Sequence, residues 1–367
     1  MELLGGYFVQ KLEKLLPVNK DKNAIVFCID ENYVKYFGVV LQSFISHINV
    51  KNIYDLVVLH KDICVNSQNK LQSILPENVS LRFYNIENAR EMYFKNITLK
   101  TKNYWSESTY YRLLIPMIFS NYEKVLYCDS DIICDNSIDS IFFIPSENKG
   151  ILAIADSFSQ ELLYDKKRYD YMINYLKINP KKYFNAGVVL FNIKNIELKD
   201  YSSKLYWVFN NLNNLLFLDQ DILNVIFENN VKFISLKYNF QLDIPTYNFS
   251  HFQSYDKSFM DDLIISEKEP IIIHFSMSEK PWDFPQMIYS KKFWCYARKS
   301  PFYEEIIYDN YNKKLKLLTY KDDIYRKYLC SKILSKLTFG DIQKKLVKKR
   351  NDLKQKVRNI RIFLRGE

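Results

Sequence analysis

Two carboxylates separated by a single residue, Asp129 and Asp131, are the side chains of this sequence best suited to chemistry. They follow the apolar run KVLYC (124–128), which predicts a buried strand. Side chains two residues apart in an extended chain point to the same side, so both carboxylates can bind one divalent cation, which prefers oxygen ligands. Asp-Ser-Asp is also common in solvated turns. The spacing alone favours the turn, and the position at the end of a buried strand makes a metal site an equal alternative.

A histidine closes another apolar run, IIIHF (271–275), and is followed by SMSEKPW. Such a histidine is often a core residue with satisfied hydrogen bonds. If this strand ends near Asp129 and Asp131, however, His274 Nε2 would complete a set of two carboxylates and one imidazole, which suits Mn²⁺ better than Mg²⁺. Lys280, in the following loop, could bind a phosphate as a point charge or could be an ordinary surface lysine.

Two further segments carry polar groups next to buried elements. Asp219, Gln220 and Asp221 come just before the helical pattern of LDQDILNVIF (218–227). Helix capping explains one or two of them, but it explains a glutamine between two aspartates less readily. Asn185 in YFNAG (183–187) directly precedes a buried strand, where a simple turn is the alternative to a functional role.

The elements that must position these residues alternate between strand and helix, which indicates an α/β domain with a mainly parallel sheet. In such sheets ligands bind at the carboxyl ends of the strands. Helices are expected within residues 33–47, 68–75 and 108–119. The predicted strands are AIVFCI (24–29), YDLVVL (54–59), LRFYNI (81–86), KVLYCD (124–129), ILAIA (151–155), GVVLFN (187–192) and IIIHF (271–275).

Composition limits the class of protein and its compartment. The 367 residues are 48% hydrophobic and 26% charged, as in a globular protein with an ample core. Six scattered cysteines without a CxxC pair argue against a disulfide scaffold and indicate a reducing compartment. No apolar run approaches the roughly 20 residues that span a bilayer. Residues 1–23 lack a secretory signal and have helical spacing, so we expect a helical extension on a cytoplasmic protein.

The net charge of +10 belongs to the C-terminal region. Residues 313–367 carry 18 Lys and Arg against 5 Asp and Glu, a net of +13, so the preceding residues carry −3. The predicted domains are the N-terminal extension at residues 1–23, an α/β core domain at 24–302 and a basic helical tail at 303–367. An apolar stripe runs along the last helix: Ile342, Leu346, Leu353, Val357, Ile360 and Leu364. Such a helix could dock a partner helix, bind nucleic acid or lie on an anionic membrane with the stripe inserted, and a basic amphipathic helix fits the last best.

Seven segments, in order over about residues 24–300, resemble the successive motifs of glycosyltransferase family 8, retaining transferases that include bacterial lipooligosaccharide galactosyltransferases and glycogenin. The segments are IVFCIDENY (25–33), YYRLLIP (110–116), KVLYCDSDIIC (124–134), AIADSF (153–158), YFNAGVVLFN (183–192), LDQDILN (218–224) and HFSMSEKPW (274–282). The resemblance implies a GT-A fold, a Rossmann-like mixed sheet that binds a nucleotide.

The resemblance also implies residue roles. Asp129, Asp131 and His274 resemble the Mn²⁺ ligands, and Lys280 the lysine on the diphosphate. The residues that resemble those around uracil and ribose are Cys28, Asp30, Asn32 and Tyr33. Those that resemble the surroundings of the donor sugar are Arg112, Asp156, Asn185, Asp219 and Gln220. This chain departs from the family at Met277, where a glycine usually lets the backbone approach phosphate closely.

The predicted reaction is retaining transfer of a hexose from UDP-galactose or UDP-glucose to a hydroxyl of a glycan or lipid-linked glycan, such as lipopolysaccharide or lipooligosaccharide. The enzyme would work on the cytoplasmic face of the inner membrane. Two alternatives keep the fold, a UDP-sugar hydrolase and a self-glycosylating primer of the glycogenin kind. A third makes the tail a nucleic-acid-binding element, and the acidic core argues against it, so no nucleic acid is expected as a partner.

Overall fold

The computed structural model describes residues 12–95, 97–101, 106–157, 166–242, 257–338 and 340–365. The chain divides into two units, Met1–Ser278 and Glu279–Glu367. The expected domain boundary at residue 302 coincides with the start of a long helix at Tyr303, whereas this division of the chain falls earlier.

A seven-stranded sheet forms the centre of the first unit, with strand order β3-β2-β1-β4-β7-β6-β8. Four of its six neighbouring pairs are parallel, and β7 runs antiparallel to β4 and β6. The mainly parallel sheet predicted from the sequence is confirmed. Its strands are β1 (Asn23–Cys28), β2 (Tyr54–His60), β3 (Val79–Asn85), β4 (Lys124–Cys128), β6 (Ile151–Ala155), β7 (Phe184–Asn192) and β8 (Val231–Phe233).

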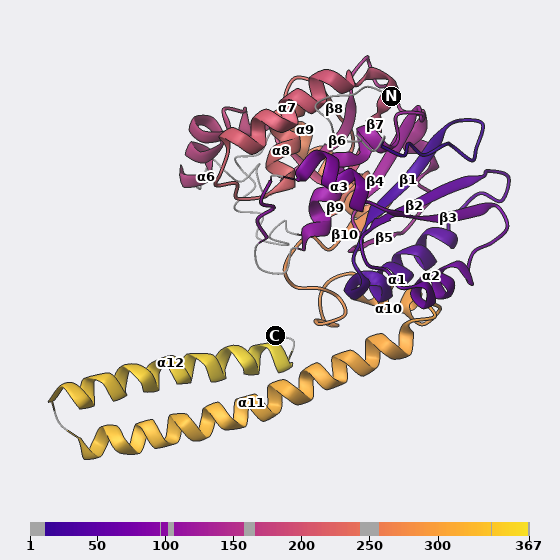
Figure 1. The fold of residues 1–367 in the computed structure, drawn as a ribbon. Coiled ribbons are helices and arrows are strands. Elements are labelled where there is room, and N and C mark those ends of the chain that lie inside the picture. Colours follow the sequence, from indigo (N-terminus) through magenta and orange to yellow (C-terminus); the bar gives the residue numbers. More distant parts are fainter. Residues whose placement is uncertain are drawn as a thin grey trace, which may run out of the picture. The chain divides into compact units, whose positions relative to one another are not determined.

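Helices cover both faces of this sheet, which explains why its strands are apolar at consecutive positions (Figure 1). On one face, the ring of Phe27 from β1 lies 4.8 Å from that of Phe37 in α1 (Val34–Ile45). On the other face, Val26 packs in one core with apolar residues of α7 (Leu198–Asn211) and α8 (Asp219–Phe227). The sheet is therefore a rigid base for the loops at its edge.

A smaller sheet of three strands determines where the predicted histidine lies. Its order is β5-β10-β9, with β5 (Ile132–Cys134), β9 (Phe240–Gln241) and β10 (Ile272–His274). β10 pairs antiparallel with β5, which directly follows the Asp-Ser-Asp segment, and its last residue lies opposite Ile132. The amide of Phe275 then donates to the carbonyl of Asp131 at 3.0 Å. This pairing brings His274 beside the acidic pair.

The remaining helices of the first unit are short, and two predictions there need correction. The helix expected at residues 108–119 is a 3-10 helix over Glu107–Leu114 followed by α4 (Ile115–Ile118), whose first turn contains Pro116. The predicted N-terminal helix does not include residues 12–17, which have no helix, and residues 1–11 lie outside the described residues. The other described α-helices of this unit are α2 (Val65–Gln72), α3 (Glu87–Phe94), α6 (Lys166–Asp170) and α9 (Lys257–Lys268), and a π-helix covers Tyr171–Leu176. Short 3-10 helices lie at Glu31–Tyr33, Asp139–Phe143, Pro180–Lys182, Ile193–Asn195 and Leu236–Tyr238.

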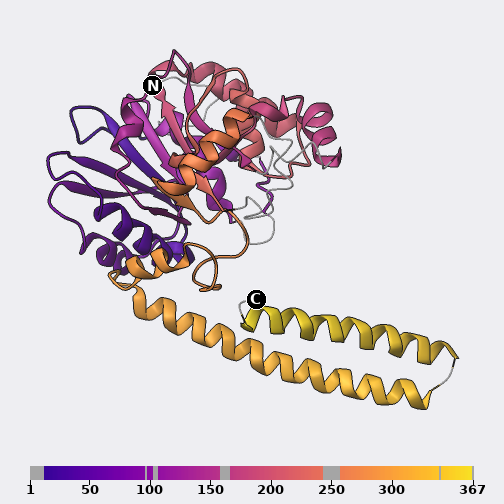
Figure 2. The ribbon, with the colours of Figure 1, turned by 180° about the vertical axis from the view of Figure 1, so that it is seen from behind.

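The second unit is helical, with α10 (Ser290–Ala297), α11 (Tyr303–Leu337) and α12 (Gly340–Arg365). α11 and α12 form an antiparallel hairpin (Figure 2). Val357 and Ile360 of α12 are buried against Ile324 of α11. Leu353, Val357 and Ile360 of the apolar stripe expected to enter a membrane therefore pack on α11 instead, whereas Ile342 at the start of the stripe is exposed. Among the described residues, none of the helices has both the length and the apolar character needed to cross a bilayer.

Candidate active site

A cavity of about 420 Å³ opens in the first unit where β1 and β4 reach their carboxyl ends, at Cys28 and Asp129. Because β7 is antiparallel to β4, its first residues lie at the same edge and contribute Asn185. α8 points its first turn, with Asp219 and Gln220, into the same space. Residues from four segments far apart in the sequence thus converge as expected for ligands at strand ends.

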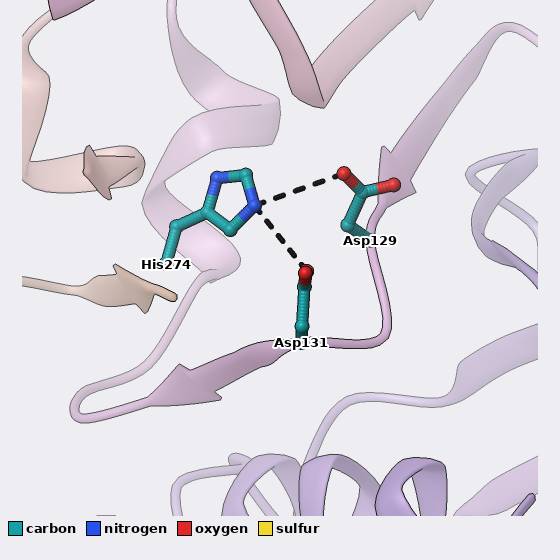
Figure 3. Close-up of side chains that lie close together, drawn as sticks. All are labelled: Asp129, Asp131 and His274. Carbon is teal, nitrogen blue, oxygen red and sulfur yellow. Dashed lines mark ion pairs between the residues drawn. The ribbon is translucent and has the colours of Figure 1, made fainter. Parts of the chain in front are cut away.

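Asp129, Asp131 and His274 lie together in this cavity (Figure 3). His274 Nε2 is 3.3 Å from Asp131 Oδ1 and 3.7 Å from Asp129 Oδ2. One ligand atom from each residue lies within 4.8 Å of the other two, so a single ion can contact all three. Two carboxylates and an imidazole are a donor set that fits Mn²⁺.

Arg112 connects two of the cavity's carboxylates. Its buried guanidinium places Nη2 2.8 Å from Asp129 Oδ1 and Nε 2.9 Å from Asp219 Oδ2, and Nη1 donates to the carbonyl of Ala186 at 2.7 Å. The guanidinium carbon also lies 4.4 Å from the ring centre of Tyr127. Burial opposes the charge of Arg112, but the two carboxylates outweigh burial and raise its pKa. Arg112, predicted near the donor sugar, holds carboxylates in place.

The three polar residues predicted at the start of α8 do not all face the cavity. Burial raises the pKa of Asp219 to about 6 although Arg112 opposes the shift, and Thr109 donates to its Oδ1 at 2.8 Å. Asp221 faces away from the cavity lining and accepts hydrogen bonds from Tyr183 (2.6 Å), Tyr171 (2.7 Å) and the amide of Phe217 (2.8 Å). Asp221 is therefore structural, in agreement with the capping alternative, whereas Asp219 and Gln220 line the cavity.

Gln220, Asn185 and Asp156 are joined by hydrogen bonds. Gln220 Oε1 accepts from the amide of Ala186 at 3.0 Å, and its Nε2 donates to Asp156 Oδ2 at 3.3 Å. Asn185 Nδ2 donates to the same oxygen at 3.2 Å. Asn185 belongs to β7 and not to a turn before it, because an irregularity in the β6–β7 pairing places it opposite Ile154.

Of the four residues predicted to bind the nucleotide, two line the cavity and two do not. Cys28 and Tyr33 line the cavity, and burial raises the pKa of the Cys28 thiol well above its usual range. The carboxylate of Asp30 instead accepts from the amide of Tyr33 at 3.2 Å, and neither Asp30 nor Asn32 is among the described lining residues.

Lys280 and Met277 lie on either side of the division between the units. Lys280 belongs to the second unit, where it is buried and its carbonyl accepts from the amides of Asp283 and Phe284. Its contact with a phosphate stays a prediction. Met277, in place of the expected glycine, lines the cavity of the first unit.

Several lining residues carried no signal in the sequence. Their side chains are small or apolar, and residue type alone does not distinguish them from ordinary loop residues. They include Ser106, Ser108, Thr109, Gly187, Phe217 and Ser276. Gly187 is a special case, because a Cβ atom there would lie 2.3 Å from Cε1 of His274.

Comparison with known proteins finds glycosyltransferases by both sequence and structure. The model of glycosyl transferase family 8 matches residues 24–285. A putative glycosyltransferase of Haemophilus influenzae is 31% identical over 220 residues, which are 59% of this chain and 62% of that protein. The lipopolysaccharide 1,3-galactosyltransferase of Salmonella typhimurium is 29% identical over 189 residues, 50% of this chain and 51% of that protein.

The apo structure of the bifunctional glycosyltransferase WbbM is similar to this chain with a TM-score of 0.70 and 26% identity, over 81% of this chain and 53% of that one. The matched region spans less than two thirds of the length of each of these three proteins.

Proposed function

The chain belongs to glycosyl transferase family 8, and from this we propose that it transfers a hexose from UDP-galactose or UDP-glucose to a hydroxyl of a glycan acceptor. The first unit has the GT-A fold predicted from the sequence, a mainly parallel mixed sheet like that of WbbM. The observation that carries the proposal is the set Asp129, Asp131 and His274 at the edge of that sheet.

The three residues would hold Mn²⁺, with Mg²⁺ as the alternative ion. When bound, the ion supplies positive charge that stabilises the diphosphate leaving group. Arg112 holds Asp129 in place beside the ion site, since its guanidinium lies between Asp129 and Asp219. Lys280 would add a second positive charge near the phosphates.

Retention of the anomeric configuration results either from a double displacement through a covalent intermediate or from same-face attack by the acceptor. A double displacement needs a nucleophile, and the residue at the expected place, Gln220, is an amide whose oxygen accepts from Ala186. We therefore favour same-face attack. The acceptor O–H bond breaks as the new C–O bond forms, the anomeric C–O bond to phosphate breaks, and the leaving phosphate takes the proton.

The acceptor we propose is a lipopolysaccharide or lipooligosaccharide glycan. A relative that acts on lipopolysaccharide supports this choice. The protein would then work at the cytoplasmic face of the inner membrane, bound through the basic second unit.

Since Leu353, Val357 and Ile360 of the α12 stripe pack on α11, the proposed membrane contact moves to the exposed start of the stripe. Exposed apolar residues gather where α11 ends and α12 begins, and Leu337 and Ile342 are 70% and 63% exposed. Exposed lysines such as Lys344 and Lys345 lie beside them on the chain. Apolar side chains flanked by lysines fit an anionic bilayer surface.

The test is release of UDP from a panel of UDP-sugars, with Mn²⁺ or with chelator, and with or without lipooligosaccharide. We expect Mn²⁺-dependent release from UDP-galactose or UDP-glucose that increases with acceptor. Asp131→Ala should abolish both transfer and Mn²⁺ dependence, whereas Asp139→Ala, outside the cavity lining, should retain both. Normal kinetics of Asp131→Ala would refute the metal site.

The same assay separates the alternatives. Release that is equally fast without acceptor would identify a hydrolase. Hexoses added to the protein itself, seen by intact mass, would identify a self-glycosylating primer.

A further inference from the structure

A chain of buried side-chain hydrogen bonds connects the metal-site histidine with the opposite wall of the cavity. His274 Nδ1 lies 2.8 Å from Asn239 Oδ1. Asn239 Nδ2 donates to Asn185 Oδ1 at 2.9 Å, and Asn185 Nδ2 donates to Asp156 Oδ2 at 3.2 Å. All four side chains are buried, and Asn239 is 0% exposed.

The direction of this chain follows from its ends. The amide of Gly187 donates to the same Asn185 atom at 2.9 Å, and a backbone N–H can only donate, so that atom is the oxygen of Asn185. The Asn239 atom facing this oxygen must then be its NH₂ group. The other end of the Asn239 amide, facing His274, is consequently its oxygen, which can only accept.

We infer that Asn239 is a positioning residue that holds His274 as the tautomer with the proton on Nδ1. In this tautomer Nε2 carries a lone pair, and this atom faces Asp129 and Asp131. The opposite tautomer would direct an N–H at the place of the ion and would leave the oxygen of Asn239 without a donor from the ring. Partners of this kind set the tautomer, the ring orientation and the basicity of metal-binding histidines.

The fold places Asn239 for this task. It stands between the 3-10 helix Leu236–Tyr238 and β9, and β9 pairs in parallel with β10, so that Gln241 lies opposite His274. The backbone N–H of Asn239 donates to the backbone carbonyl of Leu236 at 3.0 Å, which holds the main chain of Asn239 in place. The ion site and the Asp156–Gln220 wall thereby share one network of hydrogen bonds.

The tautomer can be observed without any metal, so this first test is independent of the proposed function. The protein has four histidines, and long-range ¹H–¹⁵N spectra of ¹⁵N-histidine-labelled protein distinguish the two neutral tautomers. The His274 signal is identified by its loss in His274→Gln. At alkaline pH we expect the pattern of a protonated Nδ1. A protonated Nε2 in the metal-free wild type would overturn the inference.

The second test measures affinity for Mn²⁺ alone, from the EPR signal of the free ion. This test rests on the metal site proposed above. Asn239→Leu removes the acceptor at similar volume and should weaken Mn²⁺ binding by about 10- to 100-fold. Asn239→Asp keeps an oxygen that accepts from Nδ1 but loses the donor to Asn185 Oδ1, so the tautomer should stay and Mn²⁺ affinity should fall less than in Asn239→Leu.

A matched control removes an equally buried asparagine from the far end of β7, the strand that carries Asn185. Asn192, the last residue of β7, is 0% exposed and donates to Ser146. Asn192→Leu should lower stability without changing Mn²⁺ affinity. Equal losses of affinity in Asn192→Leu and Asn239→Leu would overturn the inference, as would wild-type affinity in Asn239→Leu. If Asn239→Leu does not fold, the spectra of Asn239→Asp replace it: a His274 proton on Nδ1 supports the inference, and a proton on Nε2 overturns it. Failure of the wild type to bind Mn²⁺ would refute the proposed metal site. The tautomer of His274 would then be tested by the NMR spectra alone.

Discussion

At the scale of single residues, the polar groups of the cavity hold one another in place. Arg112 binds Asp129 and Asp219, and the Asp156 carboxylate accepts from both Asn185 and Gln220. Groups arranged in this way need little reorganisation when a charged donor binds, which is how preorganised sites stabilise developing charge.

Gly187 keeps space for the ring of His274. In Gly187→Ala the new Cβ would lie 2.3 Å from Cε1 and 2.8 Å from Nδ1 of that ring, so the ring must move. We expect at least about tenfold weaker Mn²⁺ binding and a loss of about 1–3 kcal/mol in the free energy of unfolding. Gly150→Ala is the control, because its Cβ would meet Asn230 at 2.6 Å outside the cavity lining. Unchanged Mn²⁺ affinity in Gly187→Ala would show that the ring position does not matter.

Gln220 holds the segment around Ala186 through its carbonyl oxygen. Gln220→Ala should slow transfer by about 100-fold, because small displacements of positioning groups are costly to the rate. UDP affinity should stay nearly intact, since the predicted nucleotide residues lie on other segments. Steady-state kinetics and UDP titration measure the two effects, with Gln68→Ala on α2 as the control. A large loss of UDP binding would refute the place assigned to Gln220.

At the scale of elements, the α11–α12 hairpin is where the structure differs most from the expectation based on sequence. Ile360 is 9% exposed against α11, so Ile360→Asp buries an unpaired charge at the helix contact. We expect the hairpin to lose about 2–3 kcal/mol of local stability. Hydrogen exchange of α11 and α12 measures it. Ile342→Asp, at a position 63% exposed, should change protection by less than about 0.5 kcal/mol. Equal effects of the two substitutions would contradict the packing described for α12.

At the scale of the whole molecule, positive charge is concentrated in the second unit. Reversing Lys344, Lys345, Lys348 and Lys349 to Glu should abolish flotation with anionic vesicles, since each lysine near such a surface contributes about 1 kcal/mol. Reversal of exposed lysines of the first unit is the control, and suitable ones are Lys20, Lys51, Lys61 and Lys95. Binding indifferent to lipid charge, or stronger binding to duplex nucleic acid than to vesicles, would contradict membrane attachment.

Six of the seven strands of the large sheet were predictable, because each is a short, largely apolar run covered on both faces, whereas β8, the partly exposed segment VKF, was not predicted. The acidic pair and its place at the end of β4 were predictable for the same reason, and the order of motifs along the chain indicated the family. Even the charge of the tail is a property of sequence alone. These features depend on residue type and on near neighbours in the chain.

The contacts between distant segments were decided only by the tertiary structure. β10 could have joined the large sheet, but its pairing with β5 placed His274 beside Asp129 and Asp131. Asn239 has no motif of its own and matters because β9 pairs with β10. The α12 stripe has the same pattern whether it faces a membrane or another helix, and packing against Ile324 selected the helix. An amphipathic pattern specifies that a face is covered, and only the fold specifies by what.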